Sequence, residues 1–159
     1  MAKRFVVLVV LAIVAAMAAP ASADGNKLSI GYAYLKSLED GGGSTPMGAF
    51  VSFAPGDDSG FELDLGFHRD DDLDLNSFTA ALGPRFTLGE GLPFLHVMGA
   101  VLHQRVPGTS DTGFGGMAGG GYDLGTGGTV ALRVGADFQM FFNDGENFKS
   151  LRLVVGLTF

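Results

Sequence analysis

The chain has 159 residues, of which 47% are hydrophobic, 26 are glycine and none is cysteine. This length indicates one domain, and the lack of cysteine excludes disulfides, thiolate metal sites and a cysteine nucleophile. The formal charge of −7 at pH 7 argues against nucleic acid as a partner, because domains that bind it are usually basic.

The first residues, MAKRFVVLVVLAIVAAMAAPASA, have the pattern of a secretory signal peptide. Two basic residues precede an apolar run, which closes with the small-x-small site Ala21-Ser22-Ala23. The run is shorter than the roughly 20 apolar residues that a transmembrane anchor needs. We therefore expect residues 1–23 to be removed on export and residues 24–159 to form the exported domain.

Beyond residue 23, strict alternation of apolar with polar or small residues predicts β-strands. In FELDLGFH (61–68) every odd position is apolar and every even position is polar or glycine, which is the period of a strand. The same rhythm, divided by turn residues, predicts strands near 27–36, 47–54, 61–69, 76–88, 93–103, 113–124, 129–142 and 149–159.

The segments between these strands alternate in character. PGDDSG, GEGL and GTGG are short glycine-rich turns, whereas SLEDGGGST, DDDLDL, RVPGTSDT and NDGENF are longer or more charged. Short turns at one end and longer loops at the other, with both termini at the short-turn end, predict an all-β, eight-stranded antiparallel up-and-down barrel.

Periodicity alone does not decide whether the apolar faces line the inside or the outside of this barrel. A soluble ligand-binding barrel turns them inward, and an outer-membrane barrel turns them toward lipid. Small, glycine-rich opposite faces fit the crowded interior of eight strands, and aromatic residues near strand ends fit interfacial girdles. These aromatic residues are Tyr32, Tyr34, Phe61, Phe86 and Phe94.

The last strand, LRLVVGLTF, resembles the C-terminal signal that the outer-membrane assembly machinery reads in bacterial barrel proteins. LGPRFTLGEGLPFLHVMGA (82–100), followed by GGMAGGGYDL (115–124), resembles the small OmpA/OmpX-type barrels, and the resemblance extends over residues 27–159. It implies an outer-membrane location in a Gram-negative-type bacterium, contact with outer-membrane lipid and lipopolysaccharide, and insertion by the assembly machinery. The residues of the assembly signal would be Leu151, Leu153, Val155, Leu157 and Phe159.

Charged residues on the inner faces of such a barrel need partners, because an unpaired buried ion is costly. Similar heights in the barrel predict pairs between Glu62 and Arg85 and between Asp137 and Arg152. At eight strands we favour a salt-bridge plug over a polar pathway for ions. The complete set of lumen candidates is Glu62, Asp64, Arg85, Asp123, Arg133, Asp137 and Arg152.

The glycine-rich stretch GFGGMAGGG (113–121) is not followed by a helix, so a phosphate cradle is not expected there. We interpret it as a strand whose glycines let neighbouring side chains cross the lumen. DDDLDLN (70–76) lacks the glycine and the final glutamate of a calcium loop. No metal or cofactor site is expected.

The sequence offers weak support for catalysis. None of His68, His96 and His103 lies in a His-x-Ser pair, and there is no Gly-x-Ser-x-Gly elbow. His96 lies in a segment whose two faces are both apolar, so we interpret it as a packing or lipid-interface residue.

The expected protein is a monomeric, non-enzymatic barrel with a structural or surface-interaction role. The alternatives are a small ion or solute channel, a lipid-modifying outer-membrane enzyme and a soluble periplasmic ligand-binding barrel.

Overall fold

The structure is a computed structural model, and it describes residues 26–39, 43–45, 47–56, 59–71, 74–89, 93–125, 129–143 and 146–159. The signal peptide predicted over residues 1–23 lies outside them and stays a prediction. The strands are β1 (Lys27–Ser37), β2 (Ser44–Thr45), β3 (Met47–Ala54), β4 (Ser59–Asp70), β5 (Leu75–Thr87), β6 (Phe94–Val106), β7 (Thr109–Gly125), β8 (Ala131–Asn143) and β9 (Glu146–Thr158). Among the described residues, no helix is long and apolar enough to cross a membrane.

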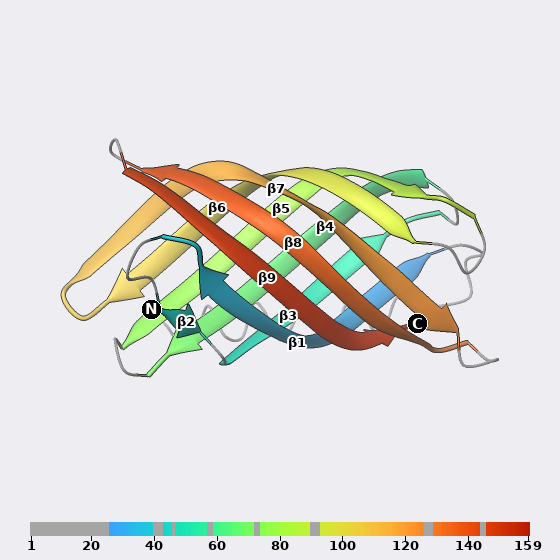
Figure 1. Cartoon of the computed structure of the whole chain (residues 1–159), viewed down its shortest axis with the longest axis horizontal. Helices are drawn as coiled ribbons and strands as arrows, with labels where there is room; N and C mark the ends of the chain where they lie inside the picture. The colour runs from blue at the N-terminus through green and yellow to red at the C-terminus, as the bar shows by residue number, and fades with distance from the viewer. Residues whose placement is uncertain are drawn as a thin grey trace.

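Eight of the nine strands close into one antiparallel barrel (Figure 1). β1 and β3 to β9 pair in sequence order, and β9 pairs back with β1 from Ser29↔Thr158 to Ser37↔Ser150. β2 is a two-residue strand that pairs antiparallel with Leu35 and Lys36 near the end of β1. The backbones of Leu28 and Phe159 exchange hydrogen bonds of 3.1 and 2.8 Å, which extend this seam. The prediction of an eight-stranded up-and-down barrel is confirmed.

The alternation along most strands separates a largely polar interior from an apolar exterior. On β4, Phe61 is 63% exposed and Glu62 is 1% exposed. This is the orientation of a membrane barrel, and it is opposite to that of a soluble ligand-binding barrel. The exposed apolar surface includes Ile30, Tyr32, Leu63, Phe67, Leu82, Val97, Val101, Phe114, Phe138, Leu153, Val155 and Leu157.

The end of the barrel opposite the termini differs from the prediction of long loops. RVPGTSDT is not a loop: β6 continues to Val106, β7 begins at Thr109, and only Pro107 and Gly108 connect them. Pro107 and Gly108 occupy the two central positions of this turn, and Gly108 has a φ of +87°. Proline followed by glycine with a positive φ is typical of a type II turn. In Figure 1 this hairpin projects furthest from the barrel.

The loop predicted over NDGENF is also mostly strand. Asn143 at the end of β8 pairs directly with Glu146 at the start of β9. The dipeptide Asp144-Gly145 between them favours two-residue hairpins. The strands at this end therefore continue where longer loops were expected.

Candidate functional site

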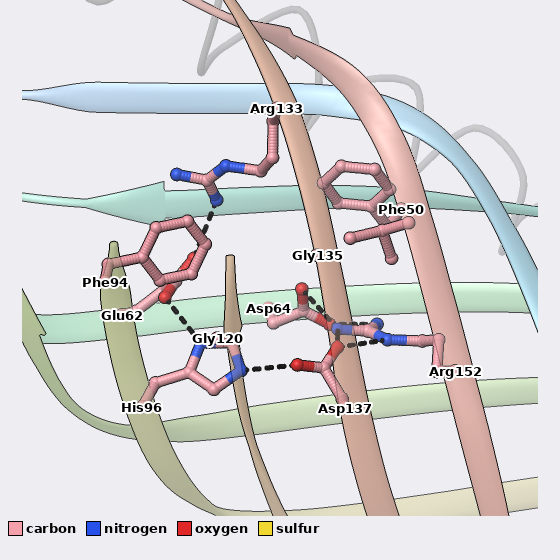
Figure 2. Close-up of a pocket in the computed structure, with 11 residues that line it drawn as sticks. Phe50, Glu62, Asp64, Phe94, His96, Gly120, Arg133, Gly135, Asp137 and Arg152 are labelled. Carbon is pink, nitrogen blue, oxygen red and sulfur yellow. Dashed lines mark hydrogen bonds and ion pairs between the residues drawn. The ribbon is translucent and has the colours of Figure 1, made fainter. Parts of the chain in front are cut away.

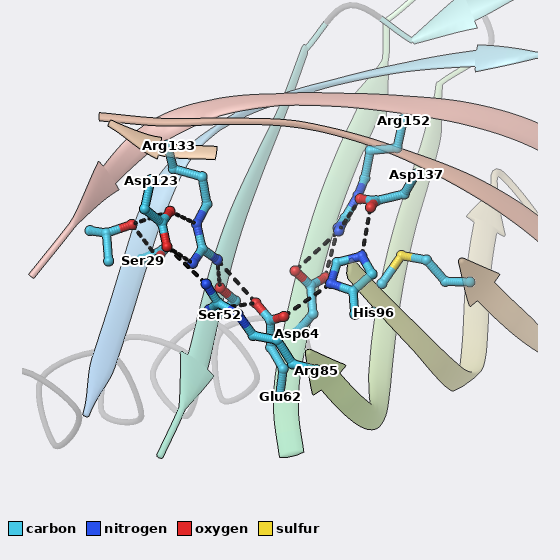
Figure 3. A network of polar contacts seen from close by, with 12 residues as sticks. Ser29, Ser52, Glu62, Asp64, Arg85, His96, Asp123, Arg133, Asp137 and Arg152 are labelled. Carbon is cyan, nitrogen blue, oxygen red and sulfur yellow. Dashed lines mark hydrogen bonds and ion pairs between the residues drawn. The ribbon is translucent and has the colours of Figure 1, made fainter. Parts of the chain in front are cut away.

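The barrel lumen holds one connected network of charged side chains (Figure 3). All seven residues that the sequence placed in the lumen take part in it, and an eighth, His96, joins them. The eight residues come from six consecutive strands: Glu62 and Asp64 on β4, Arg85 on β5, His96 on β6, Asp123 on β7, Arg133 and Asp137 on β8, and Arg152 on β9.

Arg133 organises the half of the network nearer the termini. It donates from Nε and Nη2 to the two oxygens of Asp123, at 2.7 and 3.0 Å. Its Nη1 donates to Glu62 Oε1 at 3.0 Å and to Ser52 Oγ at 2.7 Å. Arg85 also donates to Asp123, at 2.8 Å, and lies 4.0 Å from Glu62. The paired bonds of Arg133 to one carboxylate fix its orientation as well as its charge.

Phe94 lies inside the barrel, contrary to the prediction that it belongs to an interfacial girdle. Its side chain is buried, and its ring centroid is 4.1 Å from Cζ of Arg85 and 4.6 Å from Cζ of Arg133. The negative face of an aromatic ring attracts a guanidinium at such distances. Phe94 thus attracts both guanidiniums. Of the other girdle candidates, Tyr32, Phe61 and Phe86 are exposed, and Tyr34 is half-buried.

Arg152 organises the other half of the network. It donates to Asp64 through Nη1 at 2.7 Å and through Nη2 at 3.1 Å. It also donates from Nε to Asp137 Oδ2, at 2.9 Å. Its side chain is 1% exposed, so water does not reach these contacts. One guanidinium therefore bonds two buried carboxylates from different strands.

His96 connects the two halves, contrary to its interpretation as a packing or lipid-interface residue. Its Nδ1 lies 3.0 Å from Glu62 Oε2 and its Nε2 lies 2.7 Å from Asp137 Oδ1. An imidazole that donates from both ring nitrogens is cationic. Four carboxylates then face three guanidiniums and one imidazolium, so the charges balance. The seven residues predicted from the sequence comprise four carboxylates and only three cations. This missing positive charge is the sequence signal that points to a further base in the lumen.

The bond between His96 and Asp137 passes over β7, which lies between their strands. Gly119 on β7 pairs with His96 on one side and with Asp137 on the other. A Cβ at Gly119 would overlap the Asp137 carboxylate and the backbone oxygen of Ala136. The expectation that glycines in this segment let side chains cross the lumen is confirmed at this position.

The lumen has little free space around the network. A cavity of about 10 Å³ remains between residues that include Glu62, His96 and Asp137 (Figure 2). This is the least volume that holds one water molecule. Further from the termini, a buried apolar cluster follows: Ala81, Met98, Ala100, Leu102, Met117 and Phe141, with Phe148 packed against it. A charged layer is thus followed by a layer in which this apolar cluster packs beside neutral polar side chains such as Gln139 and Ser150.

The other two histidines lie in settings unlike that of a catalytic base. His68 is buried on the inner face opposite Ser77, and no hydrogen bond reaches either of its ring nitrogens from the described residues. His103 lies on the outer face, where its Nδ1 is 2.9 Å from Thr112 Oγ1. Within the described part of the chain, no three His, Asp or Glu side chains are placed to hold a metal ion.

No protein family model matches the sequence, and no curated protein matches it. Solved structures do share its fold. Neisserial surface protein A is 18% identical with a TM-score of 0.64, over 85% of this chain and 96% of that one. The N-terminal β-barrel domain of Pseudomonas aeruginosa OprF is 15% identical with a TM-score of 0.57, over 85% and 98%.

Ail, the attachment invasion locus protein of Yersinia pestis, is 18% identical with a TM-score of 0.53, over 85% of this chain and 99% of that one. Ail has also been solved in a phospholipid bilayer nanodisc and in complex with the heparin analogue sucrose octasulfate. The chain therefore has the fold of small eight-stranded outer-membrane barrels. Its apolar exterior agrees with an outer-membrane location.

Proposed function

We propose that this protein is a plugged barrel of the bacterial outer membrane with a structural or surface-interaction role. The observation that carries the proposal is the filled lumen. The polar network leaves a cavity of about 10 Å³, and an apolar cluster follows it along the same axis. Ions would have to displace paired charges and then pass a second layer of buried side chains, among them Met117, Phe141 and Gln139.

The surface role is supported by the β6–β7 hairpin. β7 has 17 residues and β6 has 13, whereas about 9 to 11 tilted residues span a bilayer. The extra length carries exposed polar side chains, among them Arg105, Thr109, Ser110 and Asp111. This hairpin offers a rigid strand pair to water beyond the apolar surface.

In planar lipid bilayers, the purified protein is expected to give no discrete conductance steps. A mobility difference between unheated and boiled samples should first establish that the barrel is folded and recovered from outer membranes. The comparison is a variant that removes part of the charged network, the double substitution Arg152→Ala and Asp137→Ala. Regular conductance steps in the wild-type protein, altered by Arg133→Gln, would contradict the plugged lumen and support the channel alternative.

The same proposal predicts that the protein does not modify lipid. The three histidines lack a bonded serine among the described residues, and two of them are buried. Deletion of the gene should leave the mass spectrum of lipid A unchanged. An added or missing acyl chain in the deletion strain, restored by the wild-type gene and lost with His68→Ala, would support the enzyme alternative.

We also propose that β9 is the segment that the assembly machinery reads. Its outer face presents Leu153, Val155, Leu157 and Phe159, each between 43% and 45% exposed. Phe159→Ser should lower the amount of heat-modifiable barrel in outer membranes several-fold. The control is Phe61→Ser, an equally apolar change on the outer face of β4. Equal losses for both variants would mean that lipid contact, not recognition of β9, explains the effect.

A further inference from the structure

A small pocket, the mouth pocket, lies at the end of the barrel opposite the termini. Its volume is about 140 Å³, roughly ten times the least space that holds one water molecule and less than the sites of drug-sized ligands, which have about 300–1,000 Å³. Its walls come from the ends of β6 to β9 and from Glu39, which follows β1 by two residues. The mouth pocket therefore has room for about one side chain.

The floor of the mouth pocket is apolar. Leu102 and Phe141 line it and belong to the buried cluster of the lumen, and Phe148 packs against that cluster. The polar lining residues of β6 and β8 lie two positions nearer the outside. The stem of a long side chain that enters from outside would thus pack on apolar groups.

The wall above this floor presents oxygen acceptors. Asp111 pairs with Gln104 across β6 and β7, and both residues line the pocket. Asn143 donates from Nδ2 to Asp111 Oδ2, and the backbone N–H of Thr112 donates to Oδ1 at 2.8 Å. These bonds hold the carboxylate in one orientation. A carboxylate accepts about four hydrogen bonds, so Asp111 can accept further donors from a ligand.

The mouth pocket is negatively charged. Its charged lining residues are Glu39 and Asp111. Among the described residues, no Lys, Arg or His side chain bonds to either carboxylate. The amide side chains of Gln104, Asn143 and Asn147 complete the polar lining. A cationic group in the pocket would therefore meet two carboxylates and no competing cation from the described part of the chain.

The cations at this end of the barrel point away from the pocket. Arg105 and Lys149 each follow an inner-face residue, so the alternation of a strand turns them outward. Arg69 also lies on the outer face and bonds to Asp71. The exposed cations of this end are Lys36, Arg69, Arg105 and Lys149. The described acids of the same end are Glu39, Asp70, Asp71, Asp74, Asp111 and Glu146. Acids thus outnumber bases here, which favours the approach of a cationic partner.

An arginine side chain fits these features better than a metal ion or a lysine side chain. Ca²⁺ and Mg²⁺ require oxygen ligands around the whole ion, whereas one side of this pocket is apolar. In the described part of the chain, no three His, Asp or Glu side chains are placed to hold a metal. A lysine ammonium is strongly hydrated and has three donors, whereas a guanidinium is weakly hydrated, has five donors and stacks on aromatic groups. A wall of carboxylates, amides and phenylalanines suits the guanidinium.

We propose that the mouth pocket receives one arginine side chain of a partner protein outside the cell, with its guanidinium at Asp111 and Glu39 and its stem on the apolar floor. The inference rests on the proposed outer-membrane location and surface role, which turn this end of the barrel outward. A pocket of this size holds only the tip of a partner, and arginine is enriched among the few side chains that anchor protein interfaces. The rest of the partner would lie against the β6–β7 hairpin, which borders the pocket and projects furthest from the barrel (Figure 1).

The test is a titration of the folded barrel in nanodiscs of neutral lipid, followed by the amide NMR signals of the lining residues Gly113 and Asn143. The probes are acetylated and amidated peptides Gly-Gly-X-Gly-Gly, in which X is arginine, lysine or norleucine. The arginine peptide should bind about tenfold more tightly than the norleucine peptide, because norleucine keeps the stem and lacks the charged donors. The lysine peptide should bind with intermediate affinity. Equal binding of the norleucine peptide would overturn the site, and equal binding of the lysine peptide would overturn the assignment to arginine.

Asp111→Asn should weaken binding of the arginine peptide about tenfold and leave that of the norleucine peptide unchanged, since it removes one charge from an exposed position of the rim. Asp74→Asn is the matched control. Asp74 is an exposed acid at the same end but outside the pocket, and asparagine tolerates its φ of 48°. This control should change binding less than about twofold, because salt screens distant charges. An equal loss in the control would mean that the overall charge of this end attracts the peptide, which would overturn the site.

Free arginine separates the two sources of a guanidinium. If free arginine binds more tightly than the peptide, the pocket takes a small molecule, and a partner protein is contradicted. Conductance steps through the wild-type lumen, or failure to fold into a heat-modifiable membrane barrel, would instead contradict the proposed function.

Discussion

Replacement of Arg152 by methionine is expected to lower the free energy of unfolding by about 3–5 kcal/mol. Methionine retains an unbranched apolar stem but leaves Asp64 and Asp137 buried without their guanidinium. His96 still contacts Asp137, whereas Asp64 loses both of its bonds to Arg152. An unpaired buried carboxylate carries most of the expected cost.

The measurement is urea unfolding of the barrel in lipid vesicles, followed by intrinsic fluorescence or by gel mobility. Arg69→Met is the control, since Arg69 forms an exposed ion pair with Asp71, and it should cost less than about 1 kcal/mol. Similar losses for the two variants would mean that burial does not isolate the network from water. The double variant Arg152→Met and Asp64→Leu should recover part of the lost stability, because it removes the orphaned charge.

Replacement of Gly119 by alanine is expected to destabilise the barrel by about 3 kcal/mol. The added methyl group would overlap the Asp137 carboxylate and the backbone oxygen of Ala136. Rotation of Asp137 could relieve the first overlap only by breaking its bond to His96, and the second requires a shift of β8. A single carbon would therefore disturb both the network and the sheet.

Gly99→Ala provides the comparison for this variant. Gly99 lies on β6 with open space where its Cβ would be, so the same substitution should change stability by no more than about 0.5 kcal/mol. Both proteins can be compared by unfolding midpoint in the same lipid. Equal stability of the two variants would show that the close approach at Gly119 is not required.

The inward and outward faces of the strands could be predicted because apolar residues alternate strictly with polar or small ones on strands such as β4 and β8. On β4 and β8, charged and small residues occupy one face and large apolar residues the other, so Glu62 and Arg133 were predicted to face the lumen, whereas the bond between them was not predicted. Membrane barrels need this separation on every strand. The closed architecture followed from eight such segments.

The position of His96 could not be predicted from β6 alone. Both faces of this strand are apolar, since the inner face continues from His96 into Met98, Ala100 and Leu102 of the apolar cluster. Alternation carries no information where the two faces are alike. Only the cross-strand register, with Gly119 between His96 and Asp137, identifies the histidine as a lumen residue. Phe94 was misplaced for the same reason.

Two of the loops opposite the termini, RVPGTSDT and NDGENF, were predicted too long because polar residues were taken as irregular structure. Thr109, Ser110, Asp111 and Thr112 are polar on both faces, yet they form ordered strand. Beyond the bilayer, a strand has water on both sides and needs no apolar face. The change to polar composition therefore predicted where the apolar surface ends, but it did not predict where the strands end.

The lumen network also constrains the order in which the protein can enter a membrane. Arg133 bonds Glu62 at a sequence separation of 71 residues, and Arg152 bonds Asp64 at a separation of 88. A hairpin of β8 and β9 that entered the hydrocarbon by itself would carry Arg133 without Glu62 and Asp123, at about 2–4 kcal/mol near the midplane, whereas Arg152 would keep Asp137 and lack only Asp64. Insertion of this hairpin alone is thus disfavoured by the same residues that stabilise the finished barrel. We therefore expect β8 and β9 to enter the membrane together with β4 and β7, which supply the missing carboxylates.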